Sequence, residues 1–459
     1  MSVPILLVVL LALSSVAYYV GQRRALSVVG GKVRQLHSLP GYNGLYVAIW
    51  CALPALLVVA VWSSFQGGVI ENLVTAGLPQ EIIEQGPQRV TLVLNEVRNV
   101  ASGSIYGEPG PEIMAAAEHY TQLQSTGRGA LIGLSLALAL GAGAIALKRI
   151  KPQLKARNAV ETVITGLLLT SSTIAVLTTI GIVLSVLFES MRFFQSVPMT
   201  EFLFGVEWSP QTAIREDQVG SSGAFGAVPL FAGTMLIAFI AMLVAVPIGL
   251  MSAIYLSEYA NFRFRAVAKP LLEILAGIPT VVYGFFAALT VAPFIRNTGS
   301  IIGLDVASES ALAAGLVMGI MIIPFVSSLS DDVINAVPQA MRDGSYGIGA
   351  TQSETIKRVI FPAALPGIVG GILLAVSRAI GETMIVVMAA GLAANLTANP
   401  LEAVTTVTVQ IVTLLVGDLE FDSPKTLAAF ALGLVLFVVT LFLNVIALYI
   451  VRKYREQYE

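Results

Sequence analysis

Nine long apolar runs limit the fold of this chain more than any other feature of its sequence. They lie at about residues 4–20, 45–65, 130–147, 162–188, 228–256, 271–295, 311–330, 367–392 and 427–451. A helix needs about 20 mainly apolar residues to cross the hydrocarbon core of a bilayer, so each run is near or above that length. Charged residues make up 12% of the 459 residues, against about 25% in soluble domains. The sequence therefore predicts an all-α polytopic membrane protein with about nine transmembrane helices.

Basic residues predict how these helices are oriented, because Lys and Arg accumulate in short cytoplasmic loops. Alternate loops carry them: Arg23, Arg24, Lys32, Arg34; Lys148, Arg149, Lys151, Lys155, Arg157; Arg263, Arg265, Lys269; Arg342, Lys357, Arg358; and Arg452, Lys453, Arg455. The intervening loops carry far fewer, so the N-terminus is predicted outside and the C-terminus in the cytoplasm. A cleaved signal peptide is the alternative for the first run. A retained anchor is favoured, because basic residues follow this run and none precedes it.

The domain organisation follows from the same pattern. Residues 1–158 are predicted to form an N-terminal three-span region whose outside polar segment, 66–129, is either a small lobe or a loosely ordered loop. Residues 159–459 form a six-span unit with both ends in the cytoplasm. Within the outside segment 393–426, an apolar stretch is predicted to be re-entrant or interfacial, because a tenth span would break the charge alternation. No clear internal repeat supports an inverted-repeat secondary transporter.

Metal and enzyme chemistry find little support. Cys51 is the single cysteine, and the two histidines, His37 and His119, are far apart in sequence, so neither a disulfide nor a metal site is predicted. The sequence lacks a G-x-x-x-x-G-K-[ST] phosphate loop, a G-x-S-x-G elbow and an H-E-x-x-H zinc motif. An intramembrane hydrolase is therefore poorly supported, and any nucleotide hydrolysis is expected from a partner.

The cytoplasmic loop 331–366 is too polar to cross a membrane but carries strong helix signals. Pro338 suits the first turn of a short helix that runs to about Tyr346, and Gly347 and Gly349 then break it.

A second short helix is predicted to begin with a capping box, in which Thr351 is the N-cap and Glu354 lies three residues on. It is predicted to stop before Pro362. Short helices are marginal alone in water, and this loop is predicted to lack a core, so a partner that binds the helices in a groove is expected to stabilise them. The alternative is a connector that rests against the membrane surface.

Two charges interrupt the eighth run, in the stretch "SRAIGETM". Arg378 and Glu382 are four residues apart, so on one helix they share a face and can pair, while Ser377 and Thr383 add hydroxyls nearby. A charge near mid-bilayer costs at least about 2.5 to 3.5 kcal/mol, so something must offset that cost. Two explanations stay open on this spacing alone. Either the pair is satisfied within the bundle and holds its helices together, or Arg378 borders a pathway for an anion that its planar fork of donors recognises.

Prolines inside the runs predict kinks. Pro279, with glycines on either side, removes a backbone hydrogen bond from the sixth span, and Pro247 and Pro324 do the same in theirs. Gating and packing both remain open as explanations, with packing favoured.

The cytoplasmic loop resembles the EAA loop of ABC importer permeases, in which a Glu-Ala-Ala triplet precedes a glycine and, after a helix, a hydrophobic-proline pair. The matching residues here are Asp343, Gly344 and Ser345 for the triplet, then Gly349 and Ala350, and finally Phe361 and Pro362. The two alanines are replaced, and Gly344 should weaken its helix by about 0.5 to 1 kcal/mol. The resemblance implies that this loop is a coupling helix, which docks into a groove on a separate ATPase subunit.

"SRAIGETM" resembles the R-A-I-G-E-T motif of phosphate-specific ABC importer permeases. The stretches "FLFGVEWSP", "FGAVPLFAGT" and "KPLLEILAGIPTVVYGFF" resemble the same family, in the order of its PstC-type subunit, and the first three spans resemble the extended N-terminus of its long members. This resemblance implies that the last six spans form a type I ABC importer permease core in a bacterial inner membrane. It also implies transport roles for Arg378 and Glu382.

The partners that this resemblance implies are a second homologous permease subunit, two copies of an ATP-binding subunit that holds ATP and magnesium, and a periplasmic phosphate-binding protein. The chain itself is expected to meet membrane lipid, to bind no cofactor and to bind no nucleic acid. The cargo implied is inorganic phosphate. Another oxyanion, such as phosphonate or sulfate, stays open on the residues alone, as does a non-transporting signalling or scaffold role.

Overall fold

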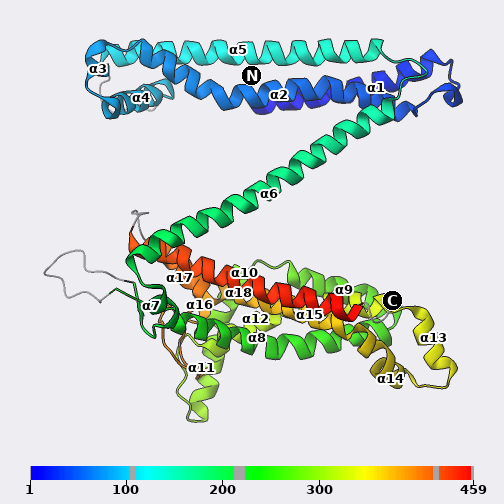
Figure 1. Cartoon of the computed structure of the whole chain (residues 1–459), viewed down its shortest axis with the longest axis vertical. Coiled ribbons are helices and arrows are strands. Elements are labelled where there is room, and N and C mark those ends of the chain that lie inside the picture. The colour runs from blue at the N-terminus through cyan, green and yellow to red at the C-terminus, as the bar shows by residue number, and fades with distance from the viewer. Residues whose placement is uncertain (1, 104–109, 211–222, 417–422, 456–459) are drawn as a thin grey trace. The chain divides into compact units, whose positions relative to one another are not determined.

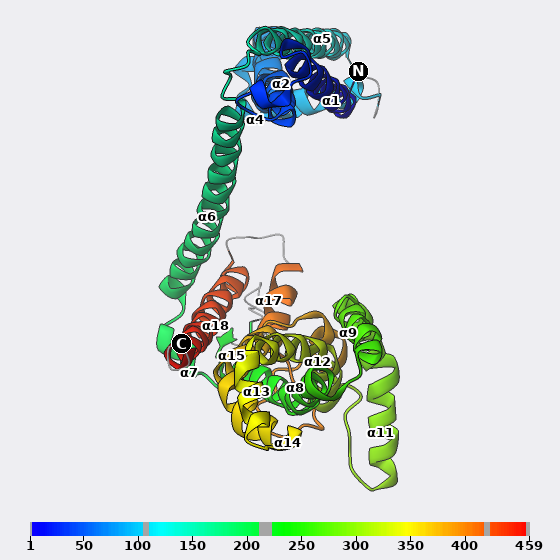
Figure 2. The same cartoon turned by 90° about the vertical axis from the view of Figure 1, so that its right-hand side faces the viewer.

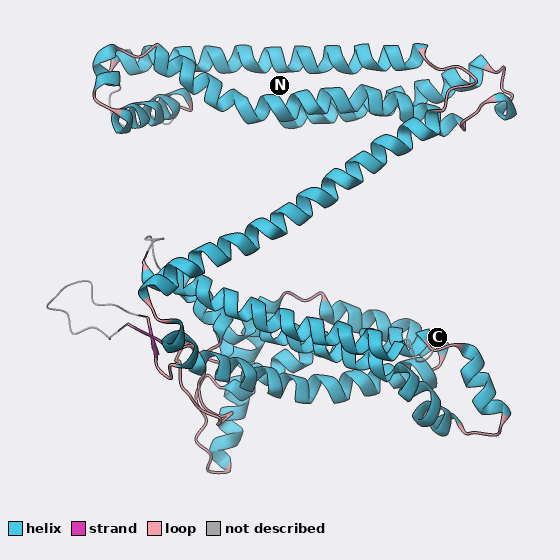
Figure 3. Cartoon of the chain, viewed as in Figure 1, coloured by secondary structure: helices cyan, strands magenta, loops and turns pink. Residues whose placement is uncertain are grey.

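The computed structural model describes residues 2–103, 110–210, 223–416 and 423–455, and it is helical apart from one short pair of strands (Figures 1 and 3). Nine helical segments in these ranges are long and apolar enough to cross a membrane, which confirms the predicted class. They are Val3–Val28, Pro40–Ala76, Pro111–Lys148, Ala156–Ser196, Val228–Tyr259, Thr280–Ile301, Ala311–Ala336, Gln352–Ile380 and Pro424–Lys453.

The chain forms two compact units, Met1–Leu177 and Thr178–Glu459, which divide within helix α6 (Ala156–Ser196). The boundary predicted between residues 158 and 159 stays a prediction.

The first unit is built on three long helices that pack side by side, α1 (Val3–Val28), α2 (Pro40–Ala76) and α5 (Pro111–Lys148). A 3-10 turn at Val33–Gln35 lies between α1 and α2. A small residue lets α5 pack closely on α2, since Gly143 of α5 lies against Cys51 of α2.

Two short helices, α3 (Gln80–Glu84) and α4 (Pro87–Ala101), pack on the far ends of α2 and α5 around buried Val93 and Val97. The described part of the segment 66–129, which the sequence predicts to lie outside, is therefore a small helical lobe, one of the two predicted alternatives. Residues 104–109 of this segment lie outside the described residues.

The second unit is centred on α8 (Val228–Ile254) and α12 (Ala311–Ala336), which pack along their length. Glycines make that close approach possible: a Cβ on Gly315 would lie 2.7 Å from Ile240, and one on Gly249 would lie 2.8 Å from Val326. The other helices surround this pair, and a π-helical turn at Tyr255–Tyr259 extends α8. Their bounds are α9 (Phe262–Ala276), α10 (Thr280–Phe286), α11 (Ala292–Ile301), α15 (Phe361–Ile380), α16 (Met384–Ala389) and α18 (Pro424–Arg455).

The sixth span differs from its prediction. Instead of a kinked helix over 271–295, α9 ends at Ala276, and α10 begins after Pro279, which stands at its N-cap; a π-helical turn at Ala287–Val291 then leads into α11. The helix ends before Pro279: Gly277 is the C-cap of α9, and Ile278, as the residue before a proline, is disfavoured in helical geometry. Pro247 and Pro324, in contrast, lie inside α8 and α12 without ending them.

Short elements close one end of this unit. Helix α7 (Met199–Phe204) precedes the antiparallel strands β1 (Trp208–Ser209) and β2 (Ala224–Phe225). Helix α17 (Val407–Val416) packs against α18 and α8 and is too short to cross a membrane, which agrees with the prediction of no tenth span. At the opposite end lie α13 (Gln339–Gly347) and α14 (Gln352–Thr355), next to each other in both views (Figures 1 and 2).

Candidate transport site and coupling loop

The eighth span is interrupted at the stretch that carries its two charges. Helix α15 ends at Ile380 and α16 begins at Met384, so the continuous helix predicted over 367–392 is wrong. The carboxylate of Glu382 accepts a hydrogen bond from the Met384 amide at 3.1 Å, and the Glu382 carbonyl accepts one from the Thr408 hydroxyl at 2.8 Å. These bonds replace the helical partners that the break removes, so the chain can leave the helix inside the span.

Arg378 and Glu382 do not pair, which corrects the geometry predicted for them. Their spacing places them on one face only if the helix continues, and it ends between them. The Arg378 guanidinium lies 5.5 Å from the centre of the Phe325 ring, a cation–π contact, and has no hydrogen bond or ion pair with any described residue. Glu382 instead caps α16.

The two hydroxyl residues take secondary places at this break. Ser377 is partly buried, and its carbonyl accepts a hydrogen bond from the Gly381 amide at 3.3 Å. The Thr383 hydroxyl donates to the Gly381 carbonyl at 3.4 Å. In the described part of the chain neither hydroxyl bonds to Arg378, so their role toward a ligand stays a prediction.

The two interrupted spans meet. Helix α10 follows the break at Pro279, α16 follows the break at Glu382, and the two short helices pack against each other. Gly284 permits this contact, because a Cβ there would lie 3.0 Å from the Met384 carbonyl oxygen and 2.8 Å from the Met388 sulfur. The motif "GIPTVVYG" and the motif "SRAIGETM" are therefore parts of one structure.

A buried polar cluster supports this structure from α17. The Gln410 carboxamide accepts a hydrogen bond from Trp208 Nε1 at 2.9 Å and donates to the Leu392 carbonyl at 3.2 Å. Sequence reasoning missed Gln410 and Thr408. The signal available was that both are polar residues within the otherwise apolar stretch "TVTVQIVTLLV".

Arg378 is exposed near mid-depth of the bundle, and this position limits what can lie next to it. Phe325 stands close to the midpoint of α12, so the guanidinium lies near mid-depth of the bundle. Its neighbours Ala375 and Ala379 are buried in the core, whereas Arg378 is exposed on the surface of this chain. A lipid-facing guanidinium at that depth costs at least about 2.5 to 3.5 kcal/mol, so this face suits water, an anion or another subunit better than lipid.

A second group of charges is satisfied within the chain. The buried carboxylate of Asp331, on α12, accepts hydrogen bonds from Arg265 at 3.0 Å and from Lys269 at 2.7 Å, both on α9. The hydrogen bond to Asp331 raises the pKa of Lys269 above its ordinary value. Asn335 donates to the same carboxylate at 2.9 Å. This cluster, which sequence reasoning missed, fixes α9 beside α12.

In the loop 331–366, the candidate coupling loop, the predicted capping box is confirmed. The Thr351 hydroxyl accepts from the Glu354 amide, and the Glu354 carboxylate accepts from the Thr351 amide at 3.0 Å. The preceding helix ends in a Schellman motif, with Ala350 N bonded to Ser345 O and Gly349 N bonded to Tyr346 O. Gly349 has a φ of +88°, which explains why glycine suits this position.

Two predictions about this loop are wrong. The second helix does not stop before Pro362. It continues through a π-helical turn at Ile356–Ile360 into α15, because the wider turn bonds Phe361 N to Ile356 O and makes room for the proline ring.

The loop also has a core within the chain, where Ile356 and Ile360 pack against Ala253 and Ile334. Two polar contacts hold α13 as well: Arg342 pairs with Glu258 at 3.0 Å, and the Ser345 and Thr355 hydroxyls lie 2.9 Å apart. An external surface is therefore not required to stabilise it.

The tip of the loop, in contrast, is open. Asp343, Gly344, Gly349, Thr351 and Glu354 are all exposed, while Ser345 is buried and Ala350 is partly buried. Ile348, which sequence reasoning missed, is 88% exposed between the two helices. An apolar side chain so exposed beside a rigid turn suits a protein contact. Its signal in the sequence was an isolated apolar residue between two glycines.

This arrangement, a helical bundle with interrupted spans, an exposed mid-depth cation and a structured loop at one end, is compatible with a membrane permease. The comparisons with known proteins agree. Residues 245–456 match the family model described as binding-protein-dependent transport system inner membrane component, and residues 7–178 match one described as phosphate ATP-binding cassette transporter.

Two relatives illustrate the match. The phosphate transport system permease protein PstC of Mesorhizobium japonicum is 33% identical over 270 residues, which is 55% of this chain and 78% of that protein. The probable ABC transporter permease protein YqgH of Bacillus subtilis is 30% identical over 240 residues, 52% of this chain and 74% of that protein. A solved structure, of the MetNI methionine ABC transporter in an inward-facing conformation, matches with a TM-score of 0.36 at 17% identity, over 50% of this chain and 94% of that one. The chain belongs to the family of binding-protein-dependent transport permeases, in its PstC-type group.

Proposed function

We propose that this chain is the transmembrane permease subunit of an ATP-driven importer of inorganic phosphate, and that it forms the pathway together with a second homologous permease subunit. The observation that carries the proposal is Arg378. It is a cation near mid-depth, exposed on the surface of this chain and without an acidic partner among the described residues. A second permease subunit that encloses this face would place Arg378 on a shared aqueous pathway.

The cargo is an oxyanion because of what a guanidinium recognises. Its planar fork of N–H donors matches two oxygens of a phosphate group at once, and Phe325 holds it from below without using those donors. Relatives that are phosphate transport system permease proteins favour phosphate among the oxyanions. Glu382 caps α16 in this state, and the break beside it supplies a hinge for alternating access.

Energy would reach the pathway through the coupling loop. The exposed tip around Ile348 and Gly349 docks into a groove on an ATP-binding subunit, two copies of which bind ATP and magnesium and hydrolyse ATP, so that this chain carries no cofactor. The continuous helix from α14 through α15 ends two residues after Arg378, and it would transmit movement of the tip to the break.

The remaining partner is a periplasmic phosphate-binding protein at the end that holds α7, α17 and the two strands. With this arrangement the chain lies in a bacterial inner membrane, its N-terminus outside and its C-terminus in the cytoplasm, as the basic residues of alternate loops favour.

Reconstitution tests this proposal. The chain, the second permease subunit and the ATP-binding subunit are placed in vesicles with the binding protein outside, and uptake of labelled phosphate is measured with and without ATP. ATP-dependent uptake that unlabelled phosphate competes away, and that sulfate or phosphonate does not, is the expected result. Preferential uptake of sulfate or phosphonate contradicts the cargo, and no uptake of any oxyanion contradicts the transport role.

A further inference from the structure

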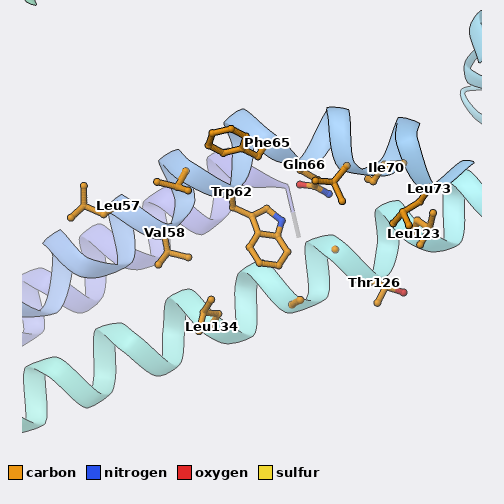
Figure 4. A pocket seen from close by; sticks show the side chains of 14 residues that line it. Leu57, Val58, Trp62, Phe65, Gln66, Ile70, Leu73, Leu123, Thr126 and Leu134 are labelled. Atoms are coloured by element: carbon orange, nitrogen blue, oxygen red, sulfur yellow. The ribbon is translucent and has the colours of Figure 1, made fainter. Parts of the chain in front are cut away.

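The first unit contains a groove that the proposed function does not use. It lies between α2 and α5, has a volume of about 710 Å³, and is lined almost wholly by apolar side chains (Figure 4). Among the described residues that line it, none carries a charge. Several of its side chains are well exposed, Val61 at 58% and Phe65 at 68% for example. So large an open apolar surface indicates a binding site for an apolar partner.

The groove crosses the level at which these helices leave the hydrocarbon core. Helices α2 and α5 contain 37 and 38 residues, about 55 Å each, whereas the core is about 30 Å thick. Gln66 lies against Gly127, the neighbour of the charged Arg128, so these residues mark that boundary. Leu57 and Leu134 line the groove on the membrane side of the boundary, and Leu73 and Leu123 continue it beyond.

A polar group at this level lacks a partner. The indole of Trp62 projects from α2 toward α5 at the groove, and its Nε1 is buried without a hydrogen-bond acceptor (Figure 4). A buried donor without an acceptor costs about 1 to 3 kcal/mol. The other polar side chains of the lining, Gln66 and Thr126, follow Trp62 along the groove (Figure 4). An occupant should therefore be apolar below this level and offer hydrogen-bond acceptors at it.

We propose that the groove binds a diacyl phospholipid from the outer leaflet, with an acyl chain along Val61 and Leu134 and its ester groups at the level of Gln66 and Thr126. The groove is continuous with the bilayer-facing surface of α2, most of whose span is not buried within the chain, so lipid reaches it directly. Ester carbonyls are acceptors of the kind that Trp62 lacks, and the flexible Gln66 side chain is the group that must move to admit one.

Tryptophan fluorescence tests this site, because Trp62 lies in the groove and Trp50 lies on the same helix outside it, 44% exposed. The delipidated full-length chain in detergent is titrated with phosphatidylglycerol that carries brominated acyl chains, which quench nearby indoles. The Trp62 signal is the difference between the parent and Trp62→Phe, and the Trp50 signal is the difference between the parent and Trp50→Phe. Trp208 stays in place, since its hydrogen bond to Gln410 is structural.

Saturable loss of most of the Trp62 signal is expected, with weak and non-saturating loss of the Trp50 signal. Ala130→Phe fills the groove and should abolish the saturable phase, while Leu140→Phe, at an exposed position of α5 outside the lining, should not. Equal quenching of both tryptophans, or an unchanged response in Ala130→Phe, means that only the surrounding lipid is detected and overturns the proposal. Loss of the Trp62 response on assembly with the partner subunits would assign the groove to a protein helix and also overturn it.

Discussion

Two charged sites in the second unit differ in whether this chain supplies their hydrogen-bonding partners. Asp331 is 4% exposed and has three donors, from Arg265, Lys269 and Asn335, all supplied by this chain. Arg378 is exposed near mid-depth, and within the described part of the chain its guanidinium makes a cation–π contact with Phe325 but no hydrogen bond or ion pair. The first group is complete without any partner and fixes α9 against α12. The second is incomplete, and an incomplete charge at that depth indicates a site whose other half comes from outside the chain.

The coupling loop repeats this contrast on a smaller scale. Its base is closed by the Arg342–Glu258 ion pair, in which both side chains are about nine-tenths buried. Its tip ends in Ile348, which is 88% exposed. In both places the internal contacts hold a rigid support, and the group that the support presents is left for a partner.

The largest expected effect on stability comes from the closed cluster. Asp331→Asn leaves Arg265 and Lys269 without their carboxylate and should lower the free energy of unfolding by about 3 kcal/mol, the low end for a broken buried pair, because both cations are about a third exposed. Thermal unfolding in detergent measures it. Asp332→Asn is the matched control, since Asp332 is 67% exposed and lies 3.6 Å from Lys269. Equal losses in the two variants would show that the cluster is not what holds α9.

Substitution of Arg378 should affect transport and leave the stability of the chain unchanged. Arg378→Gln is expected to lower the initial rate of phosphate uptake about 100-fold, or roughly 2.7 kcal/mol, without loss of stability, because no described partner is left unpaired. Arg378→Lys keeps the charge but not the planar fork, so an intermediate loss of about tenfold is expected. Arg296→Gln, an exposed arginine of α11, is the control. If Arg378→Gln unfolds the chain but the protein that remains transports normally, the charge is structural.

A contact can be predicted from the sequence when its residues are close together along the chain, and not when they are far apart. The nine spans and the Thr351 capping box could be predicted because apolar runs and caps are local patterns. The break at Glu382 could not, because the Thr408 hydroxyl that stabilises it comes from 26 residues away, and an i to i+4 spacing assumes an unbroken helix. The Asp331 cluster is also non-local, since Arg265 lies 66 residues away.

In the loop, sequence reasoning failed for a related reason. The core formed by Ile356, Ala253 and Ile334 joins three separate segments, so the loop on its own looked unsupported. Pro362 predicted the end of a helix because a proline fits poorly inside an α-helix. The π-helical turn before it is wider than an α-helical turn, so the helix continues.

The open tip of the loop gives the next prediction. Ile348→Ala removes an apolar side chain that contacts almost nothing in this chain, so the stability of the chain should not change. Its affinity for the ATP-binding subunit should fall by about 1 to 2 kcal/mol, roughly 5- to 30-fold in Kd, if the tip docks in a groove. Titration of the purified subunits measures this Kd. Ile301→Ala, at an 83% exposed position of α11 at the other end of the unit, is the control, and an equal change in both would argue against docking at the tip.

The smallest expected effect tests whether the backbone conformation of the tip, and not only its side chains, matters for docking. Gly349→Ala and Gly344→Ala each add one methyl group that no described atom approaches within 4 Å, apart from the adjoining residues and the helix's own backbone, so the two variants differ mainly in backbone conformation. Gly349 has a φ of +88°, which costs a side chain about 1 kcal/mol, and the Kd for the ATP-binding subunit should rise several-fold. Gly344 lies inside α13, where alanine is better than glycine by about 0.5 to 1 kcal/mol, so its variant should bind equally or more tightly. The sign of the difference is the result that matters: a rise in Kd for both variants would mean that the partner needs bare backbone at both glycines, and a rise for neither would mean that the turn at Gly349 does not shape the docking surface.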